Sequence, residues 1–332
     1  MTRLSLLDLV PVVEGGTVSQ SLANAADLAA HAESLGYQRY WVAEHHGMEG
    51  IASAATAVVI AHVAAATRTI RVGAGGIMLP NHAPLVIAEQ FGTLDALFPG
   101  RIDLGLGRAP GSDQRVARAM RRTLDSDPNA FPRDVLELQS YFADDGQTGI
   151  TATPGAGASP QMWILGSSLF GAQLAAALGL PYAFASHFAP DALDQALGVY
   201  RREFRPSATL ARPHAMAGFN IFAADTDEEA EYLASSQQQA FIALRTGNPR
   251  RLPPPVAGYR DSLGPQGAAV LNQVLSCSAT GSPATVARQL AAFVERTQVD
   301  EVMVTSAIYD HQARKRSIAI AAEVGQDLAK AA

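Results

Sequence analysis

The sequence has very little cysteine, few charged residues and no long apolar run. Its only cysteine is Cys277, so the chain can form neither an internal disulfide nor a four-thiolate metal cluster, and we expect a reducing compartment, the cytoplasm. The 25 Lys and Arg against 31 Asp and Glu give a net charge of -6, without the concentrated positive charge that nucleic acids require. The apolar stretches are too short for a signal peptide or for the ~20 residues that span a bilayer. We therefore expect neither nucleic acid nor membrane as a partner.

What the sequence does contain is a repeated pattern of strand and helix. Short apolar runs bounded by Gly and Pro alternate with segments of helical periodicity roughly every 30 to 35 residues. Eight such units without a break in composition predict a single (β/α)8 TIM barrel domain over residues 1–332. A doubly wound sheet with a second domain is the alternative, although the first unit lacks the glycine fingerprint of dinucleotide folds. The expected strands are 4–10, 39–43, 70–78, 101–107, 162–165, 182–186, 215–223 and 299–305.

Two stretches interrupt this repeat. Residues 108–159 and 246–278 follow the fourth and seventh expected strands and are rich in Gly, Pro and turn residues. Long excursions on a barrel usually build the walls of a site, so we expect these insertions to shape a substrate pocket. A helix is expected over residues 51–67, and Thr226 and Ser282 are expected to cap later helices.

Polar residues follow several of the expected strands. Because the carboxyl ends of parallel barrel strands meet at one face, these side chains should converge there. The groups expected at this face are the polar residues Asp8, Glu44, His45, His46, Arg108, Ser167, Ser168, His187, Asn220 and Ser306, together with the glycines Gly75 and Gly76.

The adjacent His45 and His46 stand where a strand passes into a turn. Neighbouring side chains leave an extended backbone on opposite sides, so both cannot bind one metal ion without a turn between them. Acid/base or hydrogen-bond chemistry by one imidazole near neutral pH is one interpretation. A pair that merely bonds loop carbonyls is another, and a metal-dependent barrel hydrolase using His45, His187 and Asp8 is a third.

Three further segments indicate a bound phosphate compound. The glycines of 73–76 lie inside a strand, where they suggest a bulge or the close approach of a ligand. Arg108 ends a strand of small residues and is suited to clamping a phosphate, while Ser167 and Ser168 precede a helix whose amides can bind an anion. Each has a plain alternative, a surface arginine or a helix cap, but on neighbouring strands they favour one phosphate site.

Taken in order, these segments resemble those of the bacterial luciferase-like flavin monooxygenases. The matching segments are 44–46, 72–80, 100–108, 166–168 and the tail helix with Arg314, Arg316 and Ser317. The resemblance implies a (β/α)8 barrel that takes reduced FMN from an NAD(P)H-dependent flavin reductase and uses O2 to oxygenate a small-molecule substrate. It also implies a homodimer paired through the second and third helices.

The same resemblance implies roles for individual residues. His45 matches the family's catalytic histidine, with Glu44 and His46 as supporting neighbours. Arg108, Ser167 and Ser168 match the ligands of the flavin phosphate, and Gly75-Gly76 matches a non-proline cis peptide beneath the flavin ring. Ser167 departs from luciferase, which carries a glutamate there.

The resemblance leaves two alternatives within the same superfamily. One is a reductase or dehydrogenase that uses a flavin or the deazaflavin F420 and has no use for O2. The other is a flavin-binding protein without catalysis, against which the retained Glu44-His45-His46 argues.

Overall fold

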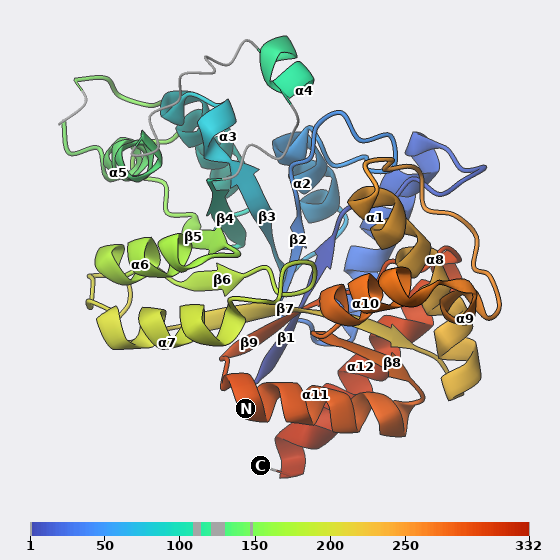
Figure 1. Cartoon of the computed structure of the whole chain (residues 1–332). Coiled ribbons are helices and arrows are strands. Elements are labelled where there is room, and N and C mark those ends of the chain that lie inside the picture. Colours follow the sequence, from blue (N-terminus) through green and yellow to red (C-terminus); the bar gives the residue numbers. More distant parts are fainter. Residues whose placement is uncertain (1, 109–113, 121–129, 147–148, 332) are drawn as a thin grey trace.

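The computed structural model describes residues 2–108, 114–120, 130–146 and 149–331, and its strands form one closed parallel barrel (Figure 1). Strands β1 to β7 pair in sequence order, and β9 pairs with both β7 and β1 to close the ring. The TIM barrel expected from the sequence is therefore confirmed. The strands are β1 (Arg3–Asp8), β2 (Arg39–Val42), β3 (Arg71–Met78), β4 (Ile102–Gly107), β5 (Gln161–Gly166), β6 (Tyr182–Phe184), β7 (Ala215–Ala223), β8 (Ser278–Gly281) and β9 (Glu301–Thr305).

Amphipathic helices surround this barrel (Figure 1). Helix α11, for example, buries Val286, Leu290 and Phe293, which recur at helical spacing and so share one face toward the strands. The helices are α1 (Val18–Ser34), α2 (Thr56–Ala65), the short 3-10 helix η1 (Leu79–Asn81), α3 (Pro84–Leu97), α4 (Gln114–Ala119), α5 (Ala130–Ala143), α6 (Leu169–Leu178), α7 (Leu193–Glu203), α8 (Asp227–Arg245), α9 (Tyr259–Ser262), α10 (Pro265–Val274), α11 (Pro283–Thr297) and α12 (His311–Ala331).

Both expected insertions are present, and the second is followed by a strand, β8, that the sequence pattern did not predict. Helices α4 and α5 follow β4, although 109–113, 121–129 and 147–148 of this insertion lie outside the described residues. Helices α8 to α10 follow β7 and lead to β8, which pairs with the outer half of β7 from Asn220 onward. Strand β8 has only four residues and no apolar run, so periodicity could not reveal it.

The expected helix over 51–67 begins later than predicted, at Thr56. Ile51 instead forms an antiparallel bridge with Pro11, and the Ser53 hydroxyl donates to the carbonyl oxygen of Ala43 at 2.6 Å. These contacts hold the first residues in an extended connection after β2.

The two predicted helix caps differ. Thr226 caps α8 as expected, because its hydroxyl accepts the backbone N–H of Glu229 at 3.1 Å. Ser282 occupies the cap position of α11, but its side chain makes no capping hydrogen bond, so that prediction was right about the position and wrong about the bond.

Buried charges fill the amino-terminal end of the barrel. The Arg39 guanidinium bonds Asp103 of β4 and Glu301 of β9, each at 2.7 Å, and lies 4.8 Å from the Trp163 ring centroid. Buried charges of opposite sign that share hydrogen bonds offset the cost of removing each charge from water. This network holds β2, β4 and β9 together at the end of the barrel opposite the predicted polar face.

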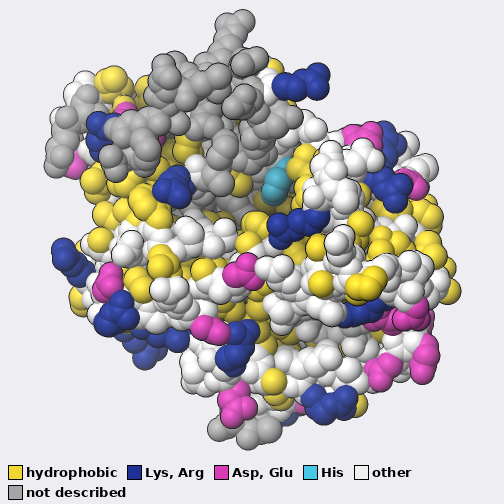
Figure 2. All heavy atoms as spheres, in the orientation of Figure 1, with side chains coloured by type: hydrophobic (Ala, Val, Ile, Leu, Met, Phe, Trp, Pro, Cys, Tyr) yellow, Lys and Arg dark blue, Asp and Glu magenta, His cyan; other side chains and the backbone are white. Residues whose placement is uncertain are grey.

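The surface carries mixed charge and a few large apolar side chains. On the face shown in Figure 2, acidic and basic side chains are scattered among hydrophobic and uncharged ones. Helices α2 and α3 expose Val58, Val86 and Leu97, at 70%, 43% and 61%. No helix within the described residues is long and apolar enough to cross a bilayer.

Candidate active site

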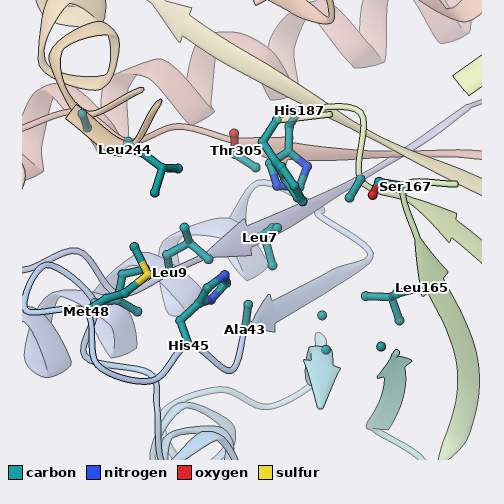
Figure 3. A pocket seen from close by; sticks show the side chains of 18 of the residues that line it. Leu7, Leu9, Ala43, His45, Met48, Leu165, Ser167, His187, Leu244 and Thr305 are labelled. Carbon is teal, nitrogen blue, oxygen red and sulfur yellow. The ribbon is translucent and has the colours of Figure 1, made fainter. Parts of the chain in front are cut away.

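A cavity of about 480 Å³ lies at the carboxyl ends of the barrel strands (Figure 3). Its volume is within the range of small-molecule sites. Most of its wall is apolar, and both helix α8 and the second insertion that follows it contribute to it. Among the apolar lining residues are Leu7, Leu9, Met48, Leu165, Phe241 and Leu244.

The barrel brings most of the predicted polar residues to this cavity. Those that line it are His45, Gly75, Gly76, Arg108, Ser167, Ser168, His187, Asn220 and Ser306. Three of the predicted residues, Asp8, Glu44 and His46, are not part of the lining.

The Asp8 carboxylate lies outside the cavity lining, and its hydrogen bonds are to other residues of the chain. It accepts hydrogen bonds from the Arg314 guanidinium at 2.7 Å, the Val10 backbone N–H at 2.8 Å and the Tyr40 hydroxyl. Within the described ranges, the structure contains no group of three His, Cys, Asp or Glu side chains arranged to hold a metal ion. His45, His187 and Asp8, which the sequence suggested as possible metal ligands, therefore do not form a metal site in the described part of the chain.

Glu44 is a buried carboxylate that organises the end of β3. It accepts hydrogen bonds from His46 at 2.7 Å, His82 at 2.9 Å, Asn81 at 3.0 Å and the Met78 N–H at 2.9 Å. Burial raises its pKa, but the hydrogen bonds from His82 and Asn81 outweigh this, so its pKa is below the usual value. The sequence analysis missed both of these partners, which follow β3 and so lie at the same barrel face.

His45 points into the cavity (Figure 3). Its Nδ1 is buried and has no hydrogen-bond partner among the residues that the structure describes. Burial lowers its pKa and the charge of Glu44 only partly opposes this, so the imidazole is neutral at pH 7. The neighbouring His46 turns away to Glu44, which agrees with its expected support of the turn.

Gly75 and Gly76 of β3 form a cavity wall without side chains. The Gly75–Gly76 peptide is cis, as the resemblance implied. A Cβ on Gly75 would lie 2.7 Å from the Trp41 ring, and one on Gly76 would lie 2.6 Å from the Gly105 carbonyl oxygen. The pairing of β3 with β4 shifts register here, which confirms the expected bulge. Both positions therefore require glycine, and the backbone itself faces the cavity.

Arg108, Ser167 and Ser168 lie together because β4 and β5 are neighbours in the barrel. The Arg108 guanidinium carbon lies 4.1 Å from the ring centroid of Phe170 in the first turn of α6. Ser168 occupies the cap position of α6, but its hydroxyl makes no capping bond. This edge offers a cation, hydroxyls and first-turn amides, the donors that an anion requires.

A closed parallel barrel with an apolar cavity at the carboxyl ends of its strands is the architecture of the TIM-barrel enzymes. The chain belongs to the luciferase-like monooxygenase family, because that family's model matches residues 2–301. It is therefore a member of an oxidoreductase family.

Individual relatives agree with this assignment. A luciferase-like monooxygenase of Escherichia coli (strain K12) is 53% identical over 325 residues, covering 98% of this chain and 97% of the relative. The N-acetyl-S-alkylcysteine monooxygenase of Bacillus subtilis (strain 168) is 36% identical over 255 residues, covering 74% and 75%. The crystal structure of apo-MsnO8 is 36% identical and superposes with a TM-score of 0.92, covering 98% and 99%.

More distant structures share the fold alone. The oxygenating constituent of 3,6-diketocamphane monooxygenase from Pseudomonas putida, in complex with FMN, has a TM-score of 0.74 at 19% identity and covers 97% of each chain. An F420-dependent secondary alcohol dehydrogenase has a TM-score of 0.65 at 13% identity, covering 96% and 97%.

Proposed function

We propose that this protein is an FMN-dependent monooxygenase that uses reduced flavin and O2 to oxygenate a small organic substrate. The observation that carries the proposal is the meeting of three features in one cavity. They are the glycine wall at Gly75 and Gly76, the cationic edge at Arg108, and the neutral imidazole of His45. Members of the same family that carry monooxygenase names, including the N-acetyl-S-alkylcysteine enzyme, support it.

The residues present fit FMN. Its phosphate needs a cation and several N–H or O–H donors, which Arg108, Ser167, Ser168 and the first turn of α6 supply. Its planar ring needs a flat surface, and Gly75 and Gly76 present backbone where any Cβ would clash. When bound as reduced FMN, the cofactor supplies the two electrons that oxygen activation requires.

The chain's own side chains bind and orient the cofactor and the substrate, and they exclude water from the cavity. The apolar lining keeps solvent from the reacting groups. His45 presents a neutral imidazole to the cavity, which can donate one hydrogen bond and accept another. Glu44 and His46 hold the turn that carries it.

Three further parts of the proposal concern the protein as a whole. Reduced FMN comes from a separate NAD(P)H-dependent flavin reductase, as the resemblance to the flavin monooxygenases implies. The protein works in the cytoplasm as a homodimer, and residues 1–332 form one domain.

The phosphate assignment is tested by comparing FMN with riboflavin, which lacks the phosphate. We expect Arg108→Ala to weaken FMN binding about tenfold or more, because it removes a charged hydrogen-bond donor, and to leave riboflavin binding nearly unchanged. Fluorescence titration of both flavins measures this. His45→Ala should retain FMN affinity, and Arg202→Ala on the exposed surface is the matched control.

Equal FMN affinity in wild type and Arg108→Ala would contradict the assignment. F420 is the alternative cofactor, because an F420-dependent enzyme has the same fold. The same titration with F420 separates the two, since tighter binding of F420 than of FMN would favour a hydride-transferring reductase or dehydrogenase.

A further inference from the structure

A second histidine faces the cavity from the side opposite His45. His187 lies in the connection that follows β6, and its ring points into the cavity toward His45 (Figure 3). The resemblance implies no role for this residue. Residues of β7 and β9 hold it in place.

The backbone of His187 is fixed from below. Asn220 on β7 donates its Nδ2–H to the His187 carbonyl oxygen at 2.7 Å. Thr305 on β9 in turn donates its hydroxyl to the Asn220 side-chain oxygen at 2.6 Å, which sets the orientation of the amide. His187 is therefore attached to two neighbouring strands through one polar chain.

The ring of His187 is fixed as well. It packs directly on Gly218, where a Cβ would lie only 2.2 Å from its Nδ1, and against the Phe188 ring at a centroid distance of 5.0 Å. Any residue larger than glycine at position 218 would push the imidazole out of this place. The ring is thus preorganised, which is what a binding residue requires.

The chemical state of the ring follows from its burial. Burial, with a smaller contribution from His45, lowers the pKa of His187 to about 4, so the ring is neutral at pH 7. Its Nδ1 is buried without a hydrogen-bond partner in the part of the chain that the structure describes. An orphaned acceptor is tolerated better than an orphaned N–H, so the proton lies on Nε2, the nitrogen left to the cavity.

We propose that His187 is a substrate-binding residue whose Nε2–H donates a hydrogen bond to an uncharged oxygen acceptor, such as the carbonyl of a ketone, ester or amide, on an otherwise apolar substrate. The inference deepens the proposed function, because it takes the same cavity as the substrate site, but it does not depend on flavin binding.

The surroundings select an uncharged acceptor over an anion. Most of the cavity wall is apolar, and of its lining arginines Arg108 is assigned to the phosphate and Arg250 lies 3.9 Å from the Glu14 carboxylate. A carboxylate buried beside His187 would therefore lose its hydration without gaining an unpaired cation as partner. Arg314 also lines the cavity, but its guanidinium is already bound to Asp8 at 2.7 Å and to the Ser306 carbonyl oxygen at 2.6 Å. A neutral carbonyl oxygen needs only the single donor that His187 offers.

The first experiment reads the tautomer directly. In ¹⁵N-labelled, flavin-free protein at pH 7, long-range ¹H–¹⁵N correlation should show His187 as a neutral ring protonated on Nε2, assigned by loss of its signals in His187→Leu. A ring protonated on Nδ1, or a doubly protonated ring, would overturn the proposal.

The second experiment compares acetophenone with its isostere α-methylstyrene, in which C=CH₂ replaces the carbonyl. Both affinities are measured on the flavin-free protein by ligand-observed NMR. We expect His187→Leu to weaken acetophenone about three- to tenfold more than α-methylstyrene, the range that one neutral hydrogen bond spans. His187→Gln, whose amide N–H lies near the place of Nε2, should retain the preference, whereas His187→Asn should lose it.

Each outcome decides for or against the proposal. Equal losses for both probes in His187→Leu, retention in His187→Asn but not in His187→Gln, or no binding of either probe to wild type would overturn it. Thermal unfolding verifies that each variant is folded, and His62→Gln on α2, outside the cavity, is the control. If wild type fails to bind FMN yet shows the His187-dependent preference, the flavin proposal fails while this one stands.

Discussion

Glycine residues allow β3 and β4 to approach each other beneath the cavity. A Cβ on Gly73 would lie 2.3 Å from the Asp103 carbonyl oxygen, and one on Gly105 would lie 2.3 Å from that of Ala74. Such distances are shorter than any real contact, so the close approach of β3 and β4 depends on the absence of side chains at Gly73 and Gly105.

A single methyl group should therefore be costly at Gly76. Its Cβ would lie 2.6 Å from the Gly105 carbonyl oxygen, so we expect Gly76→Ala to destabilise the protein by at least the ~1–3 kcal/mol that overpacking costs. Gly198→Ala is the matched control, since this helix position is exposed and open, and should gain roughly 0.5–1 kcal/mol. Urea unfolding measures both, and equal stability of Gly76→Ala and wild type would refute the steric argument.

At this scale the sequence revealed some residues of the site and not others. Strand-end position and family pattern were sufficient to place His45, Gly75 and Gly76 at the carboxyl end of the barrel, where they line the cavity. His82 donates a hydrogen bond to Glu44 although the two residues are 38 positions apart in the sequence. Nothing in the sequence pattern of either residue predicts this contact. His187 was on the predicted list, but its fixed place depends on Gly218 of another strand, a relation that only the fold shows.

Among the elements, α1 is joined to the connection before β3 by one side chain. Glu33 accepts the backbone N–H groups of Arg68 at 2.9 Å, Thr69 at 2.5 Å and Ile70 at 2.8 Å. Burial opposes ionisation, but these hydrogen bonds outweigh it and lower its pKa from 4.5 to about 2. The carboxylate thus acts as a three-way acceptor that positions α1 against the start of β3.

This lowered pKa makes the contribution of Glu33 to stability dependent on pH. A group whose pKa is lower in the folded state stabilises above its unfolded pKa, here 4.5, and loses that effect as the pH falls toward 2. We expect Glu33→Gln to cost roughly 1 kcal/mol at pH 7, since the amide accepts more weakly and the site is partly solvated. Urea unfolding at pH 7, 5 and 3.5 should show this difference shrinking with acidity. The exposed Glu295→Gln should show none, and a pH-independent cost would contradict the assignment.

The elements themselves were largely predictable, because a buried parallel strand is a short apolar run and a surface helix repeats every three to four residues. The exceptions were set by tertiary contacts. Ile51 looked helical by composition but pairs with Pro11. Strand β8 pairs with β7 from Asn220 onward, where β7 extends beyond its pairing with β9.

At the scale of the whole molecule, the buried ion pairs that stabilise the barrel and the cavity that forms the candidate site lie at opposite ends of the barrel axis. One end carries the buried ion pairs of Arg39 with Asp103 and Glu301, and the other carries the cavity. The cavity end can vary its loops while the charged end holds the strands in register. The sequence could predict this division in outline, since strand ends define the two faces, but not which ions would pair.

Exposed apolar side chains on the outside of the barrel indicate where two copies of the chain would associate. Helices α2 and α3 expose Val58 at 70%, Val86 at 43% and Leu97 at 61%, large apolar side chains that water would solvate poorly. The proposed homodimer would bury these side chains, and helices with a shared apolar face suit a two-fold interface. Figure 1 places α2 and α3 beside each other on the outside of the barrel.

Sedimentation velocity should therefore give a mass of about twice 34.8 kDa for the wild type. Val58→Glu should shift it toward the monomer, because a buried glutamate without a partner would oppose association, while glutamate keeps the helix propensity of α2. Val256→Glu is the control, since Val256 is also exposed, at 45%, but lies in the second insertion, and this variant should remain dimeric. A monomeric wild type, or a dimer unaffected by Val58→Glu, would move the proposed interface away from α2.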